Sequence, residues 1–287
     1  MTKALDTATR SILITGCSSG IGYAAAHALS KRGWRVFATA RAEADVKRLE
    51  EEGLEALALD LDSSDSIQAA VETVRERTGG RLTALFNNGA YGQPGAVEDL
   101  SRNVLRKQLE TNLLGTHELT TLVLPMMRAQ GHGRIVQNSS VLGIAALPYR
   151  GAYVCSKFAL EGLTDTLRME LKGSGIHISL IEPGPITSRF RENAYRAFQA
   201  HIDTAASAHA DTYQKVEARL AGSDSGGAFT LGPEAVVKKL IHALENPRPR
   251  PRYAVTVPTH LFAALKRILS TRGMDRVLLR STKSERE

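Results

Sequence analysis

Short apolar segments alternate with longer amphipathic segments along roughly the first two thirds of the chain. An apolar run of about four to eight residues predicts a buried strand, and apolar residues spaced three and four apart predict a helix. Strands that alternate with helices favour a parallel sheet covered by helices on both faces. The sequence therefore predicts an α/β fold with one doubly wound parallel sheet. The expected strands are SILITG, RVFATAR, LEALALDLD, LTALFNN, RIVQNSS and IHISLIEPG, followed near the C-terminus by YAVTV.

The longest expected helix runs from Ser101 to Gly133. From Arg189 to Gly232 the periodicity weakens, and we expect a loop or lid there, with AGSDSGGAFTLG as its mobile part. Residues 1–246 are expected to form a single domain, and residues 247–287 a basic extension with an amphipathic helix, PTHLFAALKRILS. The other expected helices are YAAAHALSKRG, DVKRLEEEG, SDSIQAAVETVRERTGG, GAYVCSKFALEGL and GPEAVVKKLIHALEN.

The charge distribution changes the picture of the C-terminal segment. The net charge is +7, and residues 246–287 hold ten Lys and Arg against three Asp and Glu, which accounts for all of it. The rest of the chain is neutral, and this argues against a body built to bind nucleic acid. Two cysteines, no apolar leader and no long apolar run predict free thiols in a cytoplasmic protein without a transmembrane helix. The scattered histidines form no metal-ligand spacing, so no metal site is expected.

A glycine-rich loop, TGCSSGIG, occupies residues 15–22 between the first strand and the first helix. Small residues there let the backbone approach a pyrophosphate, and the helix N-terminus offers free N–H groups and a positive dipole end. The strand before and the helix after are the context that a dinucleotide site requires. The alternative is a purely structural turn, since any tight connection from strand to helix needs glycine.

Tyr153 and Lys157 lie four residues apart in a segment that we expect to be helical. Residues at this spacing share one helix face, so a phenol and an ammonium would lie side by side. A neighbouring cation stabilises phenolate and lowers the tyrosine pKa, which would let Tyr153 exchange a proton near neutral pH. The alternative is a structural pair, with the tyrosine at the rim of the core and the lysine in solvent.

These motifs together resemble the short-chain dehydrogenase/reductase family. The family's loop reads T-G-x-x-x-G-I-G and its reactive pair Y-x-x-x-K, and the likeness runs from about Ser11 to Ser188. Ser140 stands thirteen residues before Tyr153, where the family has its catalytic serine, and Asn112 matches the family's asparagine in a proton relay. The resemblance implies a single-domain Rossmann-type fold, a nicotinamide cofactor, and a homo-oligomer, dimer or tetramer.

The resemblance also implies the residues that contact the cofactor. Ala40 replaces the acid of NAD-preferring members, and Arg41 stands where NADP-preferring members carry a base, so NADP(H) is expected. The alternatives are a solvated Arg41 and some use of NAD beside Glu43 and Asp45. The segment NNGA departs from the family's N-N-A-G by an exchange of Gly and Ala. The expected cofactor-binding residues are Gly16, Ser18, Ser19, Gly20, Ile21, Gly22, Arg41, Asp60, Leu61, Asn88, Gly89, Ala90, Tyr153, Lys157, Pro183, Gly184, Ile186 and Ser188.

The implied reaction is hydride transfer between NADPH and an aldehyde or ketone. In the family's scheme Tyr153 donates the proton, Ser140 positions the substrate oxygen, and Lys157 with Asn112 restores the proton. The segments TGCSSGIG, EPGPITSRF and TLGPEAVV resemble the branch with steroid and retinol dehydrogenases and bacterial aldehyde reductases, which implies an apolar carbonyl substrate. The pocket is expected around Leu142, Tyr149 and residues 189–229. The alternative function is a non-catalytic regulator that senses a dinucleotide on the same fold.

The last expected helix carries apolar residues on one side and basic residues nearby. One interpretation is an interfacial helix that touches anionic lipid. The other is a helix that covers part of the core with its basic side in water, and the pattern favours this second interpretation. The apolar residues are Leu261, Phe262, Leu265, Ile268 and Leu269.

Overall fold

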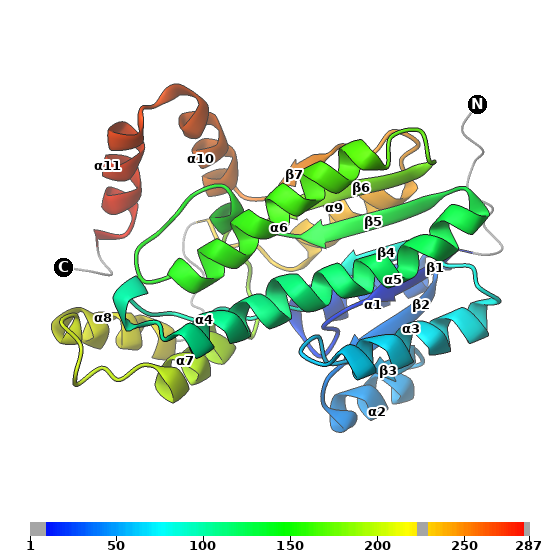
Figure 1. The fold of residues 1–287 in the computed structure, drawn as a ribbon, viewed down its shortest axis with the longest axis horizontal. Helices are drawn as coiled ribbons and strands as arrows, with labels where there is room; N and C mark the ends of the chain where they lie inside the picture. Colours follow the sequence, from blue (N-terminus) through cyan, green and yellow to red (C-terminus); the bar gives the residue numbers. More distant parts are fainter. Residues whose placement is uncertain (1–9, 223–228, 284–287) are drawn as a thin grey trace.

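The fold is built on a seven-stranded sheet in which every pair of neighbouring strands is parallel. A computed structural model describes residues 10–222 and 229–283, and Figure 1 shows the sheet with helices packed along it. The strand order is β3-β2-β1-β4-β5-β6-β7, so the predicted doubly wound α/β fold is confirmed. The strands are β1 Ser11–Ile14, β2 Arg35–Ala40, β3 Glu55–Ala58, β4 Ala84–Asn87, β5 Gly133–Asn138, β6 Ile176–Glu182 and β7 Arg252–Ala254.

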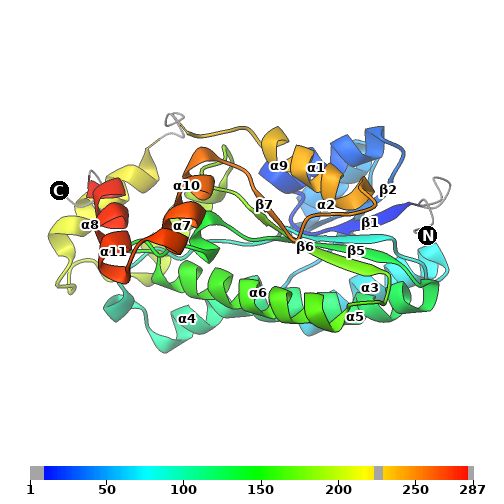
Figure 2. The same cartoon turned by 90° about the horizontal axis from the view of Figure 1, so that it is seen from above.

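Two helical layers cover the two faces of the sheet (Figure 2). Side chains alternate along each strand, so Ile12 and Ile14 join one buried cluster while Leu13 joins the other. The helices on the first face are α1 Gly20–Lys31, α2 Glu43–Glu51 and α9 Glu234–Glu245, and those on the second are α3 Ser64–Thr78, α5 Gly115–Gln130 and α6 Gly151–Glu170.

The long helix predicted from Ser101 to Gly133 is interrupted. It consists of α4, Arg102–Leu109, a π-helical turn, Glu110–Leu114, and α5. A π turn shifts the backbone hydrogen bonds by one residue and is often found at functional sites. Asn112, the residue predicted to act in the proton relay, lies within this turn.

The segment with weak periodicity contains two helices, α7 Phe190–His201 and α8 Ala210–Ala221, so the expectation of a mainly irregular loop was wrong there. The two helices bury Phe198 and Tyr213 against each other and against Ala96, in a cluster separate from the two around the sheet. The two helices pack on each other, so a small apolar cluster of their own stabilises them. Half of the predicted mobile loop, residues 223–228, lies outside the described residues.

The C-terminal segment also packs on the body. Phe262 of α10, Val257–Ile268, and Met274 of α11, Thr271–Ser281, are buried against Ala145 in the loop after β5. The sequence did not predict α11. The docked interpretation of α10 is confirmed at Phe262, while Ile268 is 78% exposed. Within the described residues no helix is both long and apolar enough to cross a membrane.

Two helical glycines test the packing. A Cβ at Gly115 would lie 1.9 Å from the carbonyl oxygen of Leu61, whereas a Cβ at Gly162 would meet no atom within 4 Å. Gly115→Ala should therefore lower the free energy of unfolding by at least about 1–3 kcal/mol. Gly162→Ala should raise it by about 0.5–1 kcal/mol, because only the glycine entropy cost changes. Urea unfolding of both variants measures this, and equal effects would contradict the assigned packing.

Candidate active site

The parallel sheet brings four loops to one edge. The carboxyl ends of β1, β4, β5 and β6 meet there, which is where doubly wound folds bind their ligands. The glycine loop follows β1, Asn88–Ala90 follows β4, Ser139–Ser140 follows β5, and the segment 183–188 follows β6. The topology therefore brings together the sequence-predicted residues from four separate parts of the chain.

The glycine loop is locked to the loop after β4. Thr15 Oγ1 accepts hydrogen bonds from the backbone N–H groups of Asn88, at 2.9 Å, and Gly89, at 2.8 Å. The Asn88 amide donates back to Thr15 O at 2.9 Å. A Cβ at Gly22 would lie 2.2 Å from Gly16 O, and one at Gly89 would lie 3.1 Å from Leu61 Cδ1. Glycine at residue 89 thus leaves room for the Leu61 side chain beside the glycine loop.

This loop fits a dinucleotide. Gly16 and Gly20 have φ of +71° and +58°, conformations that glycine adopts readily. Ser19 caps α1 with extended backbone, and in the described structure its side chain makes no capping hydrogen bond. The first N–H groups of α1 therefore remain available for a phosphate. The segment after β6 reaches the same place, because a Cβ at Gly20 would lie 3.0 Å from Ser188 Cβ.

Two arginines lie near the end of β2, one of them in contact with the glycine loop. Arg41 follows β2 directly and its side chain is exposed. Arg48 of α2, which the sequence analysis did not single out, donates from Nη2 to Ser18 O at 2.8 Å and pairs with Asp45 at 2.8 Å. Its guanidinium also lies 5.7 Å from the Tyr23 ring centroid. The sequence feature that could have pointed to Arg48 is its position seven residues after Arg41, on the helix that follows β2.

Tyr153 and Lys157 lie on the first turns of α6, as predicted. Lys157 is 3% exposed, and its Nζ donates to Asn138 O at 2.7 Å. The same nitrogen is 5.6 Å from the Tyr153 ring centroid. The Ser140 hydroxyl is a hydrogen-bonding neighbour of Tyr153 that favours a lower pKa of the phenol, and Ser140 Oγ also accepts from Leu142 N at 3.1 Å. The alternative of a solvent-exposed lysine is therefore wrong: Ser140 and Lys157 are buried, and Tyr153 beside them is half-buried.

The pKa of Tyr153 differs from the expectation. Burial raises it to about 12, and the hydrogen bond with Ser140 opposes this only in part. The predicted lowering by Lys157 does not prevail, because that ammonium is itself desolvated and bonded to a carbonyl. Burial lowers the pKa of Lys157 to about 8, while the negative charge of Glu161 acts in the opposite direction. Desolvation is thus the main electrostatic influence on both groups.

Asn112 ties the π turn to the loop after β4. Its Oδ1 accepts from Tyr91 N at 3.1 Å, and its Nδ2 donates to Tyr91 O at 2.9 Å and to Ser156 Oγ at 3.2 Å. The side chain is buried and linked to the same helix that carries Tyr153 and Lys157. Its contacts position the site, and its relay role stays a prediction.

Phe190 covers the reactive tyrosine on the side of the α7–α8 pair. The two rings meet edge to face, with centroids 5.3 Å apart. A Cβ at Gly92 would lie 2.8 Å from the Phe190 ring, so glycine leaves the space that the phenyl group uses. From the sequence, Phe190 was expected only as part of the segment 189–229 around the pocket. Tyr149, predicted for the pocket, instead packs with α7 and α8 and contacts the His209 ring.

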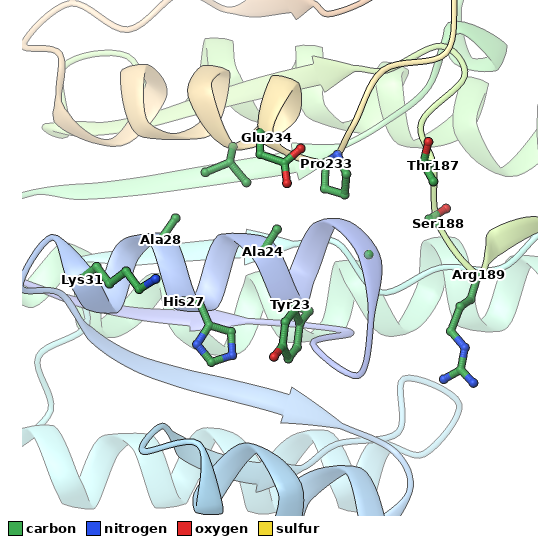
Figure 3. Close-up of a pocket in the computed structure, with 12 residues that line it drawn as sticks. Tyr23, Ala24, His27, Ala28, Lys31, Thr187, Ser188, Arg189, Pro233 and Glu234 are labelled. Atoms are coloured by element: carbon green, nitrogen blue, oxygen red, sulfur yellow. The ribbon is translucent and has the colours of Figure 1, made fainter. Parts of the chain in front are cut away.

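A cavity of about 720 Å³ lies between α1 and α9 (Figure 3). Tyr23 and His27 of α1 line it on one side and Pro233 on the other, with Ser188 at the end near Gly20. It therefore adjoins the glycine loop and does not include Tyr153. The described part of the chain contains no cluster of three His, Cys, Asp or Glu side chains arranged for a metal ion. Both cysteines are free.

Comparison with known proteins agrees with this geometry. The chain is 42% identical over 269 residues to an uncharacterized oxidoreductase, YbbO, of Escherichia coli, covering 94% of each chain. It is 35% identical over 258 residues to human 17-beta-hydroxysteroid dehydrogenase type 1, covering 85% of this chain and 77% of the relative. A solved actinorhodin polyketide ketoreductase with NADPH superposes with a TM-score of 0.70 at 28% identity, covering 87% of this chain and 97% of the other. The pattern of the family described as short chain dehydrogenase matches residues 10–198, and the chain belongs to that family.

Proposed function

We propose that this oxidoreductase, which acts with a nicotinamide cofactor as its family does, uses NADP(H) to reduce an apolar aldehyde or ketone. The observation that carries the proposal is that Ser140, Tyr153 and the buried Lys157 lie together at the carboxyl edge of the sheet. A phenol with a hydroxyl on one side and an ammonium behind it is suited to donate a proton to a substrate oxygen. The intact group makes a non-catalytic dinucleotide sensor the weaker alternative.

In the reductive direction the bound nicotinamide supplies the hydride. Tyr153 donates its phenolic proton to the carbonyl oxygen as that oxygen becomes negative. The Ser140 hydroxyl orients the oxygen, and the Lys157 ammonium stabilises the phenolate that remains. Asn112 holds the surrounding loop in register through Tyr91. Burial keeps competing water away from the exchange, which strengthens each of these electrostatic contacts.

The choice of NADP(H) rests on Arg41 and Arg48. Solved chains similar in fold have been obtained with NAD and with NADPH, so the family allows either cofactor. At the end of β2 this chain has Ala40 and Arg41, with no carboxylate to bind a ribose 2′-hydroxyl. Arg48 is already directed at the glycine loop. Two guanidinium groups beside the ribose side of the loop suit a 2′-phosphate.

An apolar substrate is supported by the residues around Tyr153. The Phe190 ring packs edge to face on the tyrosine ring, and Gly92 leaves room for it. The α7–α8 pair that carries Phe190 shares an apolar cluster with Ala96, which holds the phenyl ring in place beside the tyrosine. The likeness to a human hydroxysteroid dehydrogenase supports a steroid-like carbonyl as a candidate. Retinoid-like carbonyls and simple aldehydes are further candidates from the resemblance of the sequence motifs.

Self-association is the second part of the proposal. Phe158, Leu163 and Met169 on α6 are exposed to 38%, 45% and 66%. Apolar side chains gathered on one helix of the sheet's outer layer favour burial against a second copy of the chain. We therefore propose a homo-oligomer formed through α6.

Replacement of the phenolic hydroxyl tests the reaction. Tyr153→Phe should lower kcat with NADPH and a carbonyl by about 100-fold to 10,000-fold, the usual contribution of a positioned general acid. Tyr195→Phe is the matched control, since its hydroxyl donates to Glu217 on the outer helix pair. Loss of reduced-nicotinamide absorbance across aldehydes, ketones, steroids and retinal is the measurement. If the wild type binds NADPH but turns over no carbonyl, the sensor is the better account.

Replacement of the two arginines tests the cofactor preference. Arg41→Ala and Arg48→Ala should each weaken binding of 2′,5′-ADP about 10-fold to 100-fold, because each removes a charge-assisted hydrogen bond to phosphate. Binding of 5′-AMP should change little. Lys47→Ala is the control, since this α2 side chain pairs with Glu43 in solvent. Calorimetric titration gives the affinities, and equal losses for both nucleotides would refute a 2′-phosphate site.

A further inference from the structure

Two buried carboxylates lie near the catalytic lysine and have no part in the mechanism above. Glu161 is one helical turn beyond Lys157 on α6 and is 6% exposed. Glu182 ends β6 and is 4% exposed. Arg252 begins β7, the neighbouring strand, and its Nη1 donates to both carboxylates, at 2.6 Å in the case of Glu182. Buried carboxylates are rare unless they are paired, so this cluster calls for a physical explanation.

The charges in the cluster do not balance without the lysine. Asp165 accepts from Arg252 Nη2 at 2.6 Å, but it also pairs with Arg168, and these two partly exposed groups compensate each other. Arg252 then faces Glu161 and Glu182, which leaves one negative charge in excess. Lys157 supplies the missing positive charge from the same face of α6, because residues four apart stack on a helix.

One carboxylate oxygen of Glu161 is not used by Arg252, and the negative charge of Glu161 raises the pKa of Lys157. Its Oε2 accepts from Arg252, while its Oε1 is buried and has no hydrogen-bond partner within the described part of the chain. Burial raises the pKa of Glu161 to about 7 and lowers that of Lys157 to about 8. Two desolvated groups of opposite sign favour each other's charged form. The uncharged polar neighbour of Glu161 is Ser139. A Cβ at Gly143 would lie 2.5 Å from Ser139 Oγ and 2.9 Å from Glu161 Oε1, so the two oxygens face the same glycine.

We propose that Glu161, held by Arg252, is the counter-charge that keeps Lys157 protonated, and that it is therefore a positioning residue for the reaction. This inference rests on the proposed function only in that Lys157 must be charged to stabilise the Tyr153 phenolate. The titratable and charged groups that face Glu161 are Lys157 on α6, Glu182 on β6 and Arg252 on β7. Arg252 neutralises one carboxylate, and the field of the other acts on the lysine.

The direction of the effect follows from the charges. In Glu161→Gln the carboxylate is lost, so the Lys157 ammonium loses its counter-charge and deprotonates at a lower pH. Reduction needs that ammonium, and the alkaline limb of kcat/KM should move to lower pH by about one unit. Glu182→Gln should move it in the same direction by less, because Arg252 then pairs fully with Glu161. Asp165→Asn should leave the limb in place, since Arg168 balances that carboxylate.

A direct titration separates this inference from the proposed function. Protein labelled with ¹⁵N-lysine, with Lys157→Arg to assign the resonance, reports the pH at which the Lys157 nitrogen loses its proton. We expect that pH to fall by about one unit in Glu161→Gln and by less in Glu182→Gln. An unchanged titration in folded Glu161→Gln, or in Glu182→Gln if the first variant does not fold, overturns the inference. This readout needs no substrate, so failure to find a carbonyl that turns over would count against the proposed function alone.

Discussion

The burial of the Lys157 ammonium is the constraint on which the site depends. Removing a cation from water is costly unless hydrogen bonds and opposite charge replace its hydration. Asn138 O supplies a hydrogen bond at 2.7 Å, the Tyr153 ring lies on one side, and the Glu161 carboxylate lies one turn away. The same desolvation lowers the pKa of Lys157 and raises the pKa of Tyr153. The charge of Glu161 opposes the effect on the lysine, so nearby charges influence how readily the site exchanges a proton with a substrate.

The parallel sheet makes this burial possible. Strands β1, β4, β5 and β6 end at one edge, so the glycine loop, Asn88, Ser140 and the segment before Ser188 converge without long connections. The close backbone contacts at Gly16, Gly22 and Gly89 fix the dinucleotide loop before any ligand arrives. Strand β7 is the last strand at one edge of the sheet, and it brings Arg252 to the carboxylates near Lys157. The site residues therefore lie on the loops that directly follow the strands of the sheet.

The sequence predicted the features that depend on local pattern. The six strands before Pro183, the glycine loop and the Tyr153–Lys157 face follow from periodicity and spacing, and the structure has them. It did not predict the π turn at Asn112, because that turn depends on hydrogen bonds to Tyr91, 21 residues away. Glu161 and Arg252 are 91 residues apart, so no spacing rule joins them. The predicted direction of the Tyr153 pKa shift was wrong, because the sequence does not show how far the packed fold buries the phenol.

Transfer of a labelled hydride would test the central claim most directly. NADPH carrying deuterium at the transferable C4 position is incubated with the protein and a carbonyl that it consumes, and the alcohol is examined by mass spectrometry and NMR. The account predicts one deuterium bound to the carbinol carbon, with the new hydroxyl proton drawn from solvent through Tyr153. Alcohol without deuterium at that carbon, or no alcohol from any carbonyl despite cofactor binding, would contradict it.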